Sequence, residues 1–234
     1  MITLTDVTKR YGSKRALDQV NLELTPGKLI GLVGENGSGK STTLKLIAGL
    51  NHPTKGEIKV NGNKVNRRIA QSVSYLSELD EYYRFFNVRQ SIAFYASQFA
   101  DFDEEKAYEI LKFMKLNPND KLKHLSKGNR GRLKMVLSLS RNVPVILMDE
   151  PLSGLDPMVR NSIVKGLISF IDLEKQLVLI TTHEIRELEN VLDEVIAIKD
   201  GSVVGHHNVE QLREEKHTNI VDWMTDIYEK SNRH

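Results

Sequence analysis

The distribution of apolar residues changes along the chain. After residue 142, short apolar runs alternate with stretches in which apolar residues recur at helical spacing. The runs predict strands at 143–149, 176–182 and 194–201, and the stretches between them predict helices at 157–173 and 184–190. Apolar strands that alternate with helices are typical of an α/β fold, in which helices cover both faces of a parallel sheet.

The first part of the chain adds more strands and then a helical stretch. Apolar patterns predict strands at 2–7, 20–24, 29–33, 56–60 and 73–76. Helical patterns follow at 40–50, 87–99 and 104–116. The mostly helical stretch from 80 to 141 interrupts the alternation of strands and helices, so we expect it to be an inserted subdomain.

These patterns predict one domain and a tail. We expect a single domain over residues 1–205, with a core formed by 1–79 and 142–205 and a helical subdomain at 80–141. The tail, 206–234, is polar and has one apolar stripe at helical spacing, which consists of Ile220, Met224, Ile227 and Tyr228. The sequence therefore predicts a helical C-terminal tail.

Composition narrows the classes of protein that fit. The 234 residues are 40% hydrophobic, which is enough for one sizeable core. The chain has 33 Lys and Arg against 31 Asp and Glu, a balance that does not suggest a nucleic-acid-binding surface. It has no cysteine, which excludes disulfides, thiolate metal sites and cysteine nucleophiles. The N-terminus lacks a signal-like apolar run, and the longest apolar run, VPVILM, is too short to span a membrane, so we expect any membrane role to depend on a partner.

The segment GENGSGKST, residues 34–42, predicts a phosphate-binding loop. It matches G-x-x-x-x-G-K-[ST], follows an apolar strand and precedes a helix, which is the context that this motif requires. Its glycines let backbone N–H groups turn inward as a cradle for phosphates. An ordinary glycine-rich turn with a surface lysine is the alternative. The candidate nucleotide-binding residues are Gly34, Asn36, Gly37, Ser38, Gly39, Lys40, Ser41 and Thr42, with Ser41 also a candidate Mg²⁺ ligand.

Two further segments place candidate catalytic and metal-binding residues at the ends of apolar strands. In VILMDEP, Asp149 is a candidate Mg²⁺ ligand through water, and Glu150 is a candidate general base. In TTHE, His183 closes the next strand and would bond the γ-phosphate. The alternatives are a pair of solvated carboxylates and a structural histidine.

The segment HLSKGN, residues 124–129, predicts a second anion site. Ser126 and Gly128 stand in a small turn before a helical pattern, where unpaired N–H groups and the helix dipole favour an anion. A simple helix cap at Ser126 is the alternative.

Together these segments resemble the ATP-binding-cassette ATPases, and specifically the nucleotide-binding subunits of transporters. The resemblance covers about residues 1–205 and rests on GENGSGKST, LSKGN, VILMDEP, SGLDP at 153–157 and TTHE, in the family's order. It implies a P-loop NTPase core with an N-terminal antiparallel β subdomain, and ATP and Mg²⁺ as ligands. It also implies that two cassettes pair head to tail, so that Ser126 and Gly128 would hold the partner's ATP and Asp156 would lie at the interface. Tyr11 matches the aromatic residue that stacks on adenine; a strand-end core tyrosine is its alternative.

Three segments depart from the family's usual pattern. Glu78 stands where glutamine is usual, and we expect it to alter the dependence on Mg²⁺, for which it is a candidate ligand. Some exporter-like cassettes also have this glutamate. Lys127 replaces a glycine of the signature, which raises the question of its backbone angle. Residues 80–91 are rich in aromatics, namely Tyr82, Tyr83, Phe85 and Phe86, in the region that receives a short helix of the membrane subunit in this family; packing within the helical subdomain is the alternative.

The resemblance implies a function and partners. We expect an ATPase subunit of an exporter, with Lys40, Glu150 and His183 as catalytic residues. It would work with separately encoded transmembrane permease subunits and a second cassette, either a copy or a different chain, and would lie in the cytoplasm on the inner face of the cell membrane. We expect no nucleic-acid partner. The alternatives are a soluble ATPase of the same family that acts on nucleic acid or a protein assembly, and a P-loop kinase of small molecules.

Overall fold

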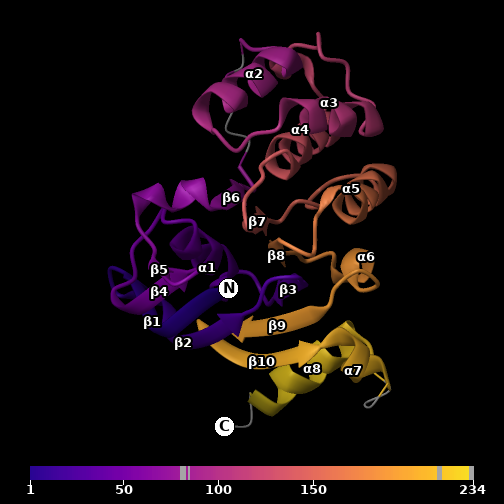
Figure 1. Cartoon of the computed structure of the whole chain (residues 1–234). Coiled ribbons are helices and arrows are strands. Elements are labelled where there is room, and N and C mark those ends of the chain that lie inside the picture. Colours follow the sequence, from indigo (N-terminus) through magenta and orange to yellow (C-terminus); the bar gives the residue numbers. More distant parts are fainter. Residues whose placement is uncertain (80–82, 84, 215–217, 232–234) are drawn as a thin grey trace.

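A six-stranded sheet forms the centre of the part of the chain that the structure describes. The computed structural model describes residues 1–79, 83, 85–214 and 218–231 (Figure 1). The strand order is β10-β9-β3-β8-β7-β6. The strands are β3 (Leu29–Val33), β6 (Val73–Leu76), β7 (Val145–Asp149), β8 (Leu177–Thr181), β9 (Glu194–Lys199) and β10 (Ser202–Asn208).

All neighbouring pairs in this sheet are parallel except the pair of β9 and β10 at one edge. Every residue of β3, β7 and β8 is buried, as expected for parallel strands that are covered on both faces. Consecutive residues contribute to two different cores. Ile146 and Met148 join one apolar cluster, whereas Val145 and Leu147 join the other. This confirms the α/β fold class.

The second core lies between the central sheet and an antiparallel sheet of order β2-β1-β4-β5. Helix α1 (Lys40–Ile47) lies in this core, with Leu44 and Ile47 fully buried. The strands of the small sheet are β1 (Ile2–Tyr11), β2 (Lys14–Leu24), β4 (Lys55–Val60) and β5 (Asn63–Lys64). Strand β2 begins earlier than the predicted 20–24, because residues 14–19 pair with β1 through their backbone, with register shifts that accommodate their polar pattern.

Helices gather at the other end of the molecule, between β6 and β7 in sequence (Figure 1). They are α2 (Val88–Gln98), α3 (Glu104–Phe113), the short 3₁₀ turn η2 (Leu122–His124) and α4 (Lys127–Leu139). Asn87 and Gln90 form a capping box that begins α2, and Asp103 caps α3. Helix α3 ends before the predicted residue 116, because Lys115 takes a positive φ of 55°.

The remaining elements cover the first core and one edge of the sheet. They are α5 (Pro157–Phe170), α6 (Ile185–Leu188), α7 (Val209–Glu214) and α8 (Ile220–Ser231). The short 3₁₀ turn η1 (Arg67–Gln71), before β6, packs on the second core through Ile69. The predicted tail boundary at residue 206 falls inside β10, since His206 pairs with Ile196 through the backbone. The apolar stripe of α8 packs on the first core, with Ile220 fully buried. Across the described residues, the helices are too short or too polar to cross a bilayer.

Candidate active site

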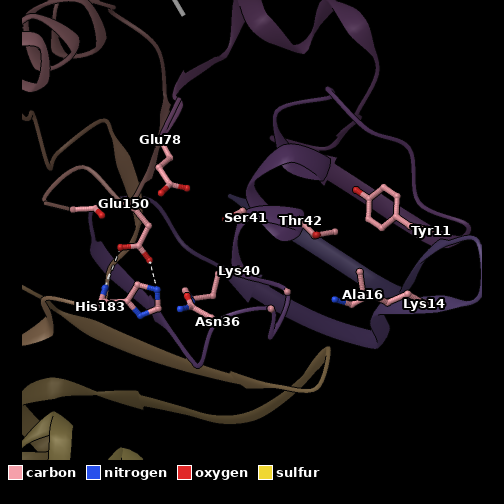
Figure 2. Close-up of a pocket in the computed structure, with 13 residues that line it drawn as sticks. Tyr11, Lys14, Ala16, Asn36, Lys40, Ser41, Thr42, Glu78, Glu150 and His183 are labelled. Carbon is pink, nitrogen blue, oxygen red and sulfur yellow. Dashed lines mark hydrogen bonds and ion pairs between the residues drawn. The ribbon is translucent and has the colours of Figure 1, made fainter. Parts of the chain in front are cut away.

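An elongated cavity of about 440 Å³ lies between the phosphate loop, the ends of the central strands and the small sheet (Figure 2). Tyr11 stands at one end of it, and Glu150 and His183 stand at the other. It is lined by Tyr11, Lys14, Ala16, Asn36, Gly37, Gly39, Lys40, Ser41, Thr42, Glu78, Glu150, Ser153 and His183. Of these, Lys14, Ala16 and Ser153 were not predicted from the sequence.

The phosphate loop joins β3 to α1 and needs glycine at its tightest points. Gly39 has a φ of 117°, and a Cβ atom there would lie 2.7 Å from the Ala16 carbonyl oxygen. Gly34 also has a positive φ and lies against the backbone of Ile198. These glycines allow the loop to lie against β2 and β9. Gly34 and Ser38 are buried and do not line the cavity.

Lys40 begins α1 and is buried inside the loop. Its Nζ atom donates to the carbonyl oxygens of Gly34, at 2.8 Å, and Glu35, at 3.1 Å. Burial lowers the pKa of Lys40, and the nearby carboxylates of Glu150, Asp149 and Glu78 oppose that shift. The loop thus holds the ammonium group of Lys40 in the nucleotide cavity, where a phosphate cradle needs a cation.

Asp149, at the end of β7, collects three hydrogen bonds. Ser41 and Thr181 donate to its Oδ1 atom, each at 2.9 Å, and the hydroxyl of Tyr75 donates to Oδ2 at 3.0 Å. Tyr75 and Thr181 belong to the two strands that flank β7, and the sequence patterns did not indicate either one. The only available signal was their position near the ends of neighbouring parallel strands.

These oxygens fit a magnesium site. Hydroxyl and carboxylate oxygens are the ligands that Mg²⁺ prefers, and it usually takes one or two protein groups together with phosphate oxygens and water. Ser41 and Asp149 already lie within hydrogen-bond distance of each other. Within residues 1–79, 83, 85–214 and 218–231, no three carboxylate or imidazole groups cluster as a complete metal cage. The residues present therefore suit a metal ion that arrives with phosphates.

Glu150 follows Asp149 and turns its side chain toward His183. Its φ is 49°, which is unusual for a residue other than glycine, and its side chain is 7% exposed. Oε2 accepts the backbone N–H of His183 at 3.1 Å, and Oε1 lies 3.1 Å from Nε2 of the same residue (Figure 2). Burial raises the pKa of the Glu150 carboxyl, while His183 and Lys40 act in the opposite direction and Asp149 adds to the rise.

Glu78 points into the same cavity as Glu150 (Figure 2). The segment that bears it is fixed by Lys134 of α4, whose Nζ atom donates to the carbonyl oxygens of Ser77, at 3.1 Å, and Glu78, at 2.9 Å. Glu78 is thus the third carboxylate, after Glu150 and Asp149, whose charge acts on Lys40.

Tyr11 lies at the far end of the cavity, with 46% of its surface exposed. Its hydroxyl accepts a hydrogen bond from Asn51 at 2.8 Å, and Nζ of Lys9 lies 4.9 Å from the ring centre. The alternative interpretation as a core tyrosine is therefore wrong. The exposed ring is available to stack on a flat ligand.

Ser126, Gly128 and Asp156 do not line this cavity. Ser126 caps α4 by accepting the N–H of Asn129 at 3.2 Å, and Asp156 caps α5 by accepting the N–H of Val159 at 3.0 Å. The two helix starts pack together, because a Cβ atom on Gly128 would lie 2.9 Å from the Val159 side chain. These three residues thus form a second surface, made of two adjacent helix N-termini.

Lys127 opens α4, where the family usually has a glycine. It lies in the first helical position and is not among the residues with positive φ, so its backbone accepts a side chain without strain. Its Nζ atom lies over Gly154, in the loop that precedes α5. A lysine in place of the usual glycine is therefore compatible with the backbone of this turn.

Comparisons with known proteins agree with this geometry. The family described as "ABC transporter" matches residues 17–153. The uncharacterized ABC transporter ATP-binding protein MJ1023 of Methanocaldococcus jannaschii is 31% identical over 216 residues, which are 90% of this chain and 79% of that protein. The Nod factor export ATP-binding protein I of Burkholderia orbicola is 34% identical over 208 residues, or 86% of this chain and 68% of that protein.

A solved structure extends the comparison to three dimensions. The ATP-binding cassette MJ0796, in a dimeric post-hydrolysis state bound to ADP and Pi, superposes with a TM-score of 0.79 at 26% identity. The match covers 89% of this chain and 99% of that one. The phosphate loop, the acidic strand end and these similarities together show that the chain belongs to the ABC transporter family of ATP-binding cassettes, as an ATPase that uses ATP with Mg²⁺.

Proposed function

We propose that this ATPase drives an exporter built from separately encoded membrane subunits. The similarity to Nod factor export ATP-binding proteins supports the direction of transport. In this proposal ATP binding closes a pair of cassettes, hydrolysis reopens it, and the chain lies in the cytoplasm on the inner face of the membrane through its partners.

The roles of the site residues follow from their positions. Lys40 and the loop N–H groups bind the phosphates, while Ser41 and Asp149 hold Mg²⁺, with Glu78 facing the same space. When bound, Mg²⁺ neutralises charge on the phosphate oxygens. Glu150 accepts the proton of the attacking water, because its carboxylate is buried and its raised pKa makes it a stronger base. His183 orients Glu150 through its backbone N–H, and its ring, which lies against Glu150 in this structure, would bond the γ-phosphate of bound ATP.

We assign the surface of Ser126, Gly128 and Asp156 to the nucleotide of a second cassette. Two helix N-termini lie side by side there, away from the chain's own nucleotide cavity, and exposed N–H groups at such positions attract phosphate. The dimeric state of the MJ0796 cassette supports this pairing.

We assign the membrane partner to an aromatic groove in the helical region. A cavity of about 450 Å³ is lined there by Tyr83, Phe86, Ser91, Phe94, Tyr95, Leu122, Leu133 and Leu137. Tyr83 is 51% exposed and Phe85 is 74% exposed, and aromatic side chains are enriched at interface cores. Tyr82, the other aromatic residue predicted for this surface, lies outside the described residues.

The observation that carries the proposal is the carboxylate of Glu150, aimed into the nucleotide cavity and held by His183. The test is the solution mass of Glu150→Gln with and without ATP and Mg²⁺. We expect ATP binding without turnover and a shift from monomer to dimer. Ser126→Arg in the same background is the matched control, because it should bind ATP and stay monomeric. Near-normal turnover by Glu150→Gln would contradict the assignment of the base.

The groove has its own test. Tyr83→Ser, in the lining of the groove, should abolish co-sedimentation with membranes that contain the permease subunits, while Tyr108→Ser, 39% exposed on α3, should leave it intact. Equal binding by both variants would exclude the groove as the docking site.

A further inference from the structure

We propose that Arg160 is a positioning residue for hydrolysis, which holds His183 in place by binding Glu184. The inference rests on the role assigned to His183 in the proposed function. Arg160 does not line the nucleotide cavity, so its effect would pass through its neighbours.

Arg160 joins two loops that are distant in sequence. Its Nε atom donates to the carbonyl oxygen of Leu155 at 2.9 Å, and its Nη1 atom lies 2.7 Å from Oε2 of Glu184. The side chain is only 19% exposed. A planar guanidinium presents its donors in a rigid fork, so Nε and Nη1 hold their two partners in one fixed geometry.

One end of this bridge belongs to the loop that precedes α5. That loop includes Ser153, which lines the nucleotide cavity, and Asp156, which we assign to the second cassette. Leu155 lies between them and is 8% exposed. The position of the guanidinium is thus set by a loop that faces both the bound nucleotide and the partner.

The other end is adjacent to His183. Glu184 is the next residue, and its backbone N–H donates to the Thr182 hydroxyl at 2.8 Å. His183 is therefore held from two sides, by Glu150 through its own N–H and by Arg160 through Glu184. Without Arg160, the carboxylate of Glu184, whose side chain is 35% exposed, loses this cation, and the segment that carries His183 loses one of its two anchors.

The expected defect lies in the chemical step and not in ATP binding. Misplacement of a reacting group by about 1 Å can slow an enzyme roughly a hundredfold. We expect Arg160→Gln to lower kcat by about tenfold or more, with KM for ATP within about twofold of wild type, because Arg160 is outside the cavity. Arg160→Lys should restore part of kcat, since lysine reaches only one of the two partners.

A double-mutant cycle tests the link. Arg160→Gln and Glu184→Gln should each lower kcat, and the double variant should be no slower than the worse single variant. Glu187→Gln is the matched control, because that carboxylate lies 3.8 Å from Nη1 and should leave kcat unchanged. Thermal melting and nucleotide binding are measured for every variant, so that loss of folding is separated from loss of positioning.

The outcomes separate this inference from the proposed function. Near-normal kcat in Arg160→Gln, or multiplicative losses in the double variant, would overturn the role of Arg160. A low kcat in His183→Ala would still support the role of His183 in that case. Near-normal kcat in His183→Ala would overturn the role of His183 itself. If Arg160→Gln does not fold, Arg160→Lys and Glu184→Gln carry the test: a lowered kcat at unchanged KM in both supports the inference, and wild-type kcat in both overturns it.

Discussion

Glu150 and His183 hold each other across two neighbouring strand ends, with the Oε2 atom of Glu150 accepting the His183 N–H at 3.1 Å and Oε1 lying 3.1 Å from its ring nitrogen. The two residues are 33 positions apart in sequence. Strands β7 and β8 are parallel and in register from Val145 with Leu177 to Asp149 with Thr181, and this pairing brings the loops after them together.

Glu150 should make the nucleotide-free protein less stable at neutral pH. Its pKa is raised in the folded state, so the protonated form contributes stability that is complete below the ordinary value of 4.5 and is lost as pH rises through the raised pKa. We expect Glu150→Gln to melt higher than wild type at pH 8, by roughly 2–4 °C for each kcal/mol gained. The gap should close as pH falls toward 4.5.

Calorimetry without nucleotide across this pH range checks the prediction. An exposed glutamate, Glu174→Gln, is the control and should show no such gap. A lower melting temperature for Glu150→Gln at pH 8 would mean that the contact with His183 outweighs the burial of the charge.

Tyr75 should tune the dependence on Mg²⁺. Its hydroxyl donates to the Asp149 oxygen that Ser41 and Thr181 do not contact. Tyr75→Phe removes a hydrogen bond to a charged group, worth about 1.5–3 kcal/mol, and should raise the Mg²⁺ concentration for half-maximal ATPase activity several-fold. Tyr108→Phe, on α3, should leave the curve unchanged, and identical curves for both variants would contradict the role of Tyr75.

Glu78 should weaken ATP binding when Mg²⁺ is scarce. Its carboxylate faces the same cavity as Glu150 (Figure 2), and like charges would repel there when a triphosphate is bound. Removing an unfavourable interaction of about 1 kcal/mol changes affinity about fivefold. We therefore expect Glu78→Gln to lower KM for ATP by about that factor at low Mg²⁺ and low salt.

The difference should shrink as Mg²⁺ or salt rises, because both screen the repulsion. Titrations of wild type, Glu78→Gln and the distant control Glu57→Gln on β4 measure it. A KM that rises in Glu78→Gln would show that the carboxylate acts mainly as a metal ligand.

The C-terminal helix should be displaced by a side chain at Gly205. A Cβ atom there would lie 2.6 Å from Cδ1 of Ile227 and 2.7 Å from Cζ2 of Trp223. Trp223 is 4% exposed and is the single tryptophan of the chain. We expect Gly205→Val to cost about 1–3 kcal/mol by overpacking and to shift tryptophan emission to longer wavelength.

Gly205→Ala provides a graded control, with a smaller shift. Emission spectra and denaturant unfolding of the three proteins measure both effects. An unchanged spectrum in Gly205→Val would mean that α8 moves aside without exposing Trp223.

The local spacing of residue types in the sequence was enough to predict the phosphate loop and the parallel sheet of this protein. The glycines and lysine of residues 34–42, between an apolar strand and a helix, predict a phosphate loop because that chemistry needs consecutive residues. The apolar strands at 143–149 and 176–182 predict a buried parallel sheet because few other structures bury such runs. Strand β10 was not predicted, because its residues are partly polar and show no apolar alternation. Its pairing with β9 through the backbone does not depend on such a pattern.

Tertiary structure decided how these pieces act on one another. The bond between Tyr75 and Asp149 joins residues 74 apart, and the bridge from Arg160 to Glu184 joins helix α5 to the loop after β8. Such contacts depend on strand order, register and helix packing, which no short stretch of sequence records. Individual site residues could therefore be predicted from the sequence. The residues that orient them could be identified only from the tertiary structure, in which the strands and helices pack together.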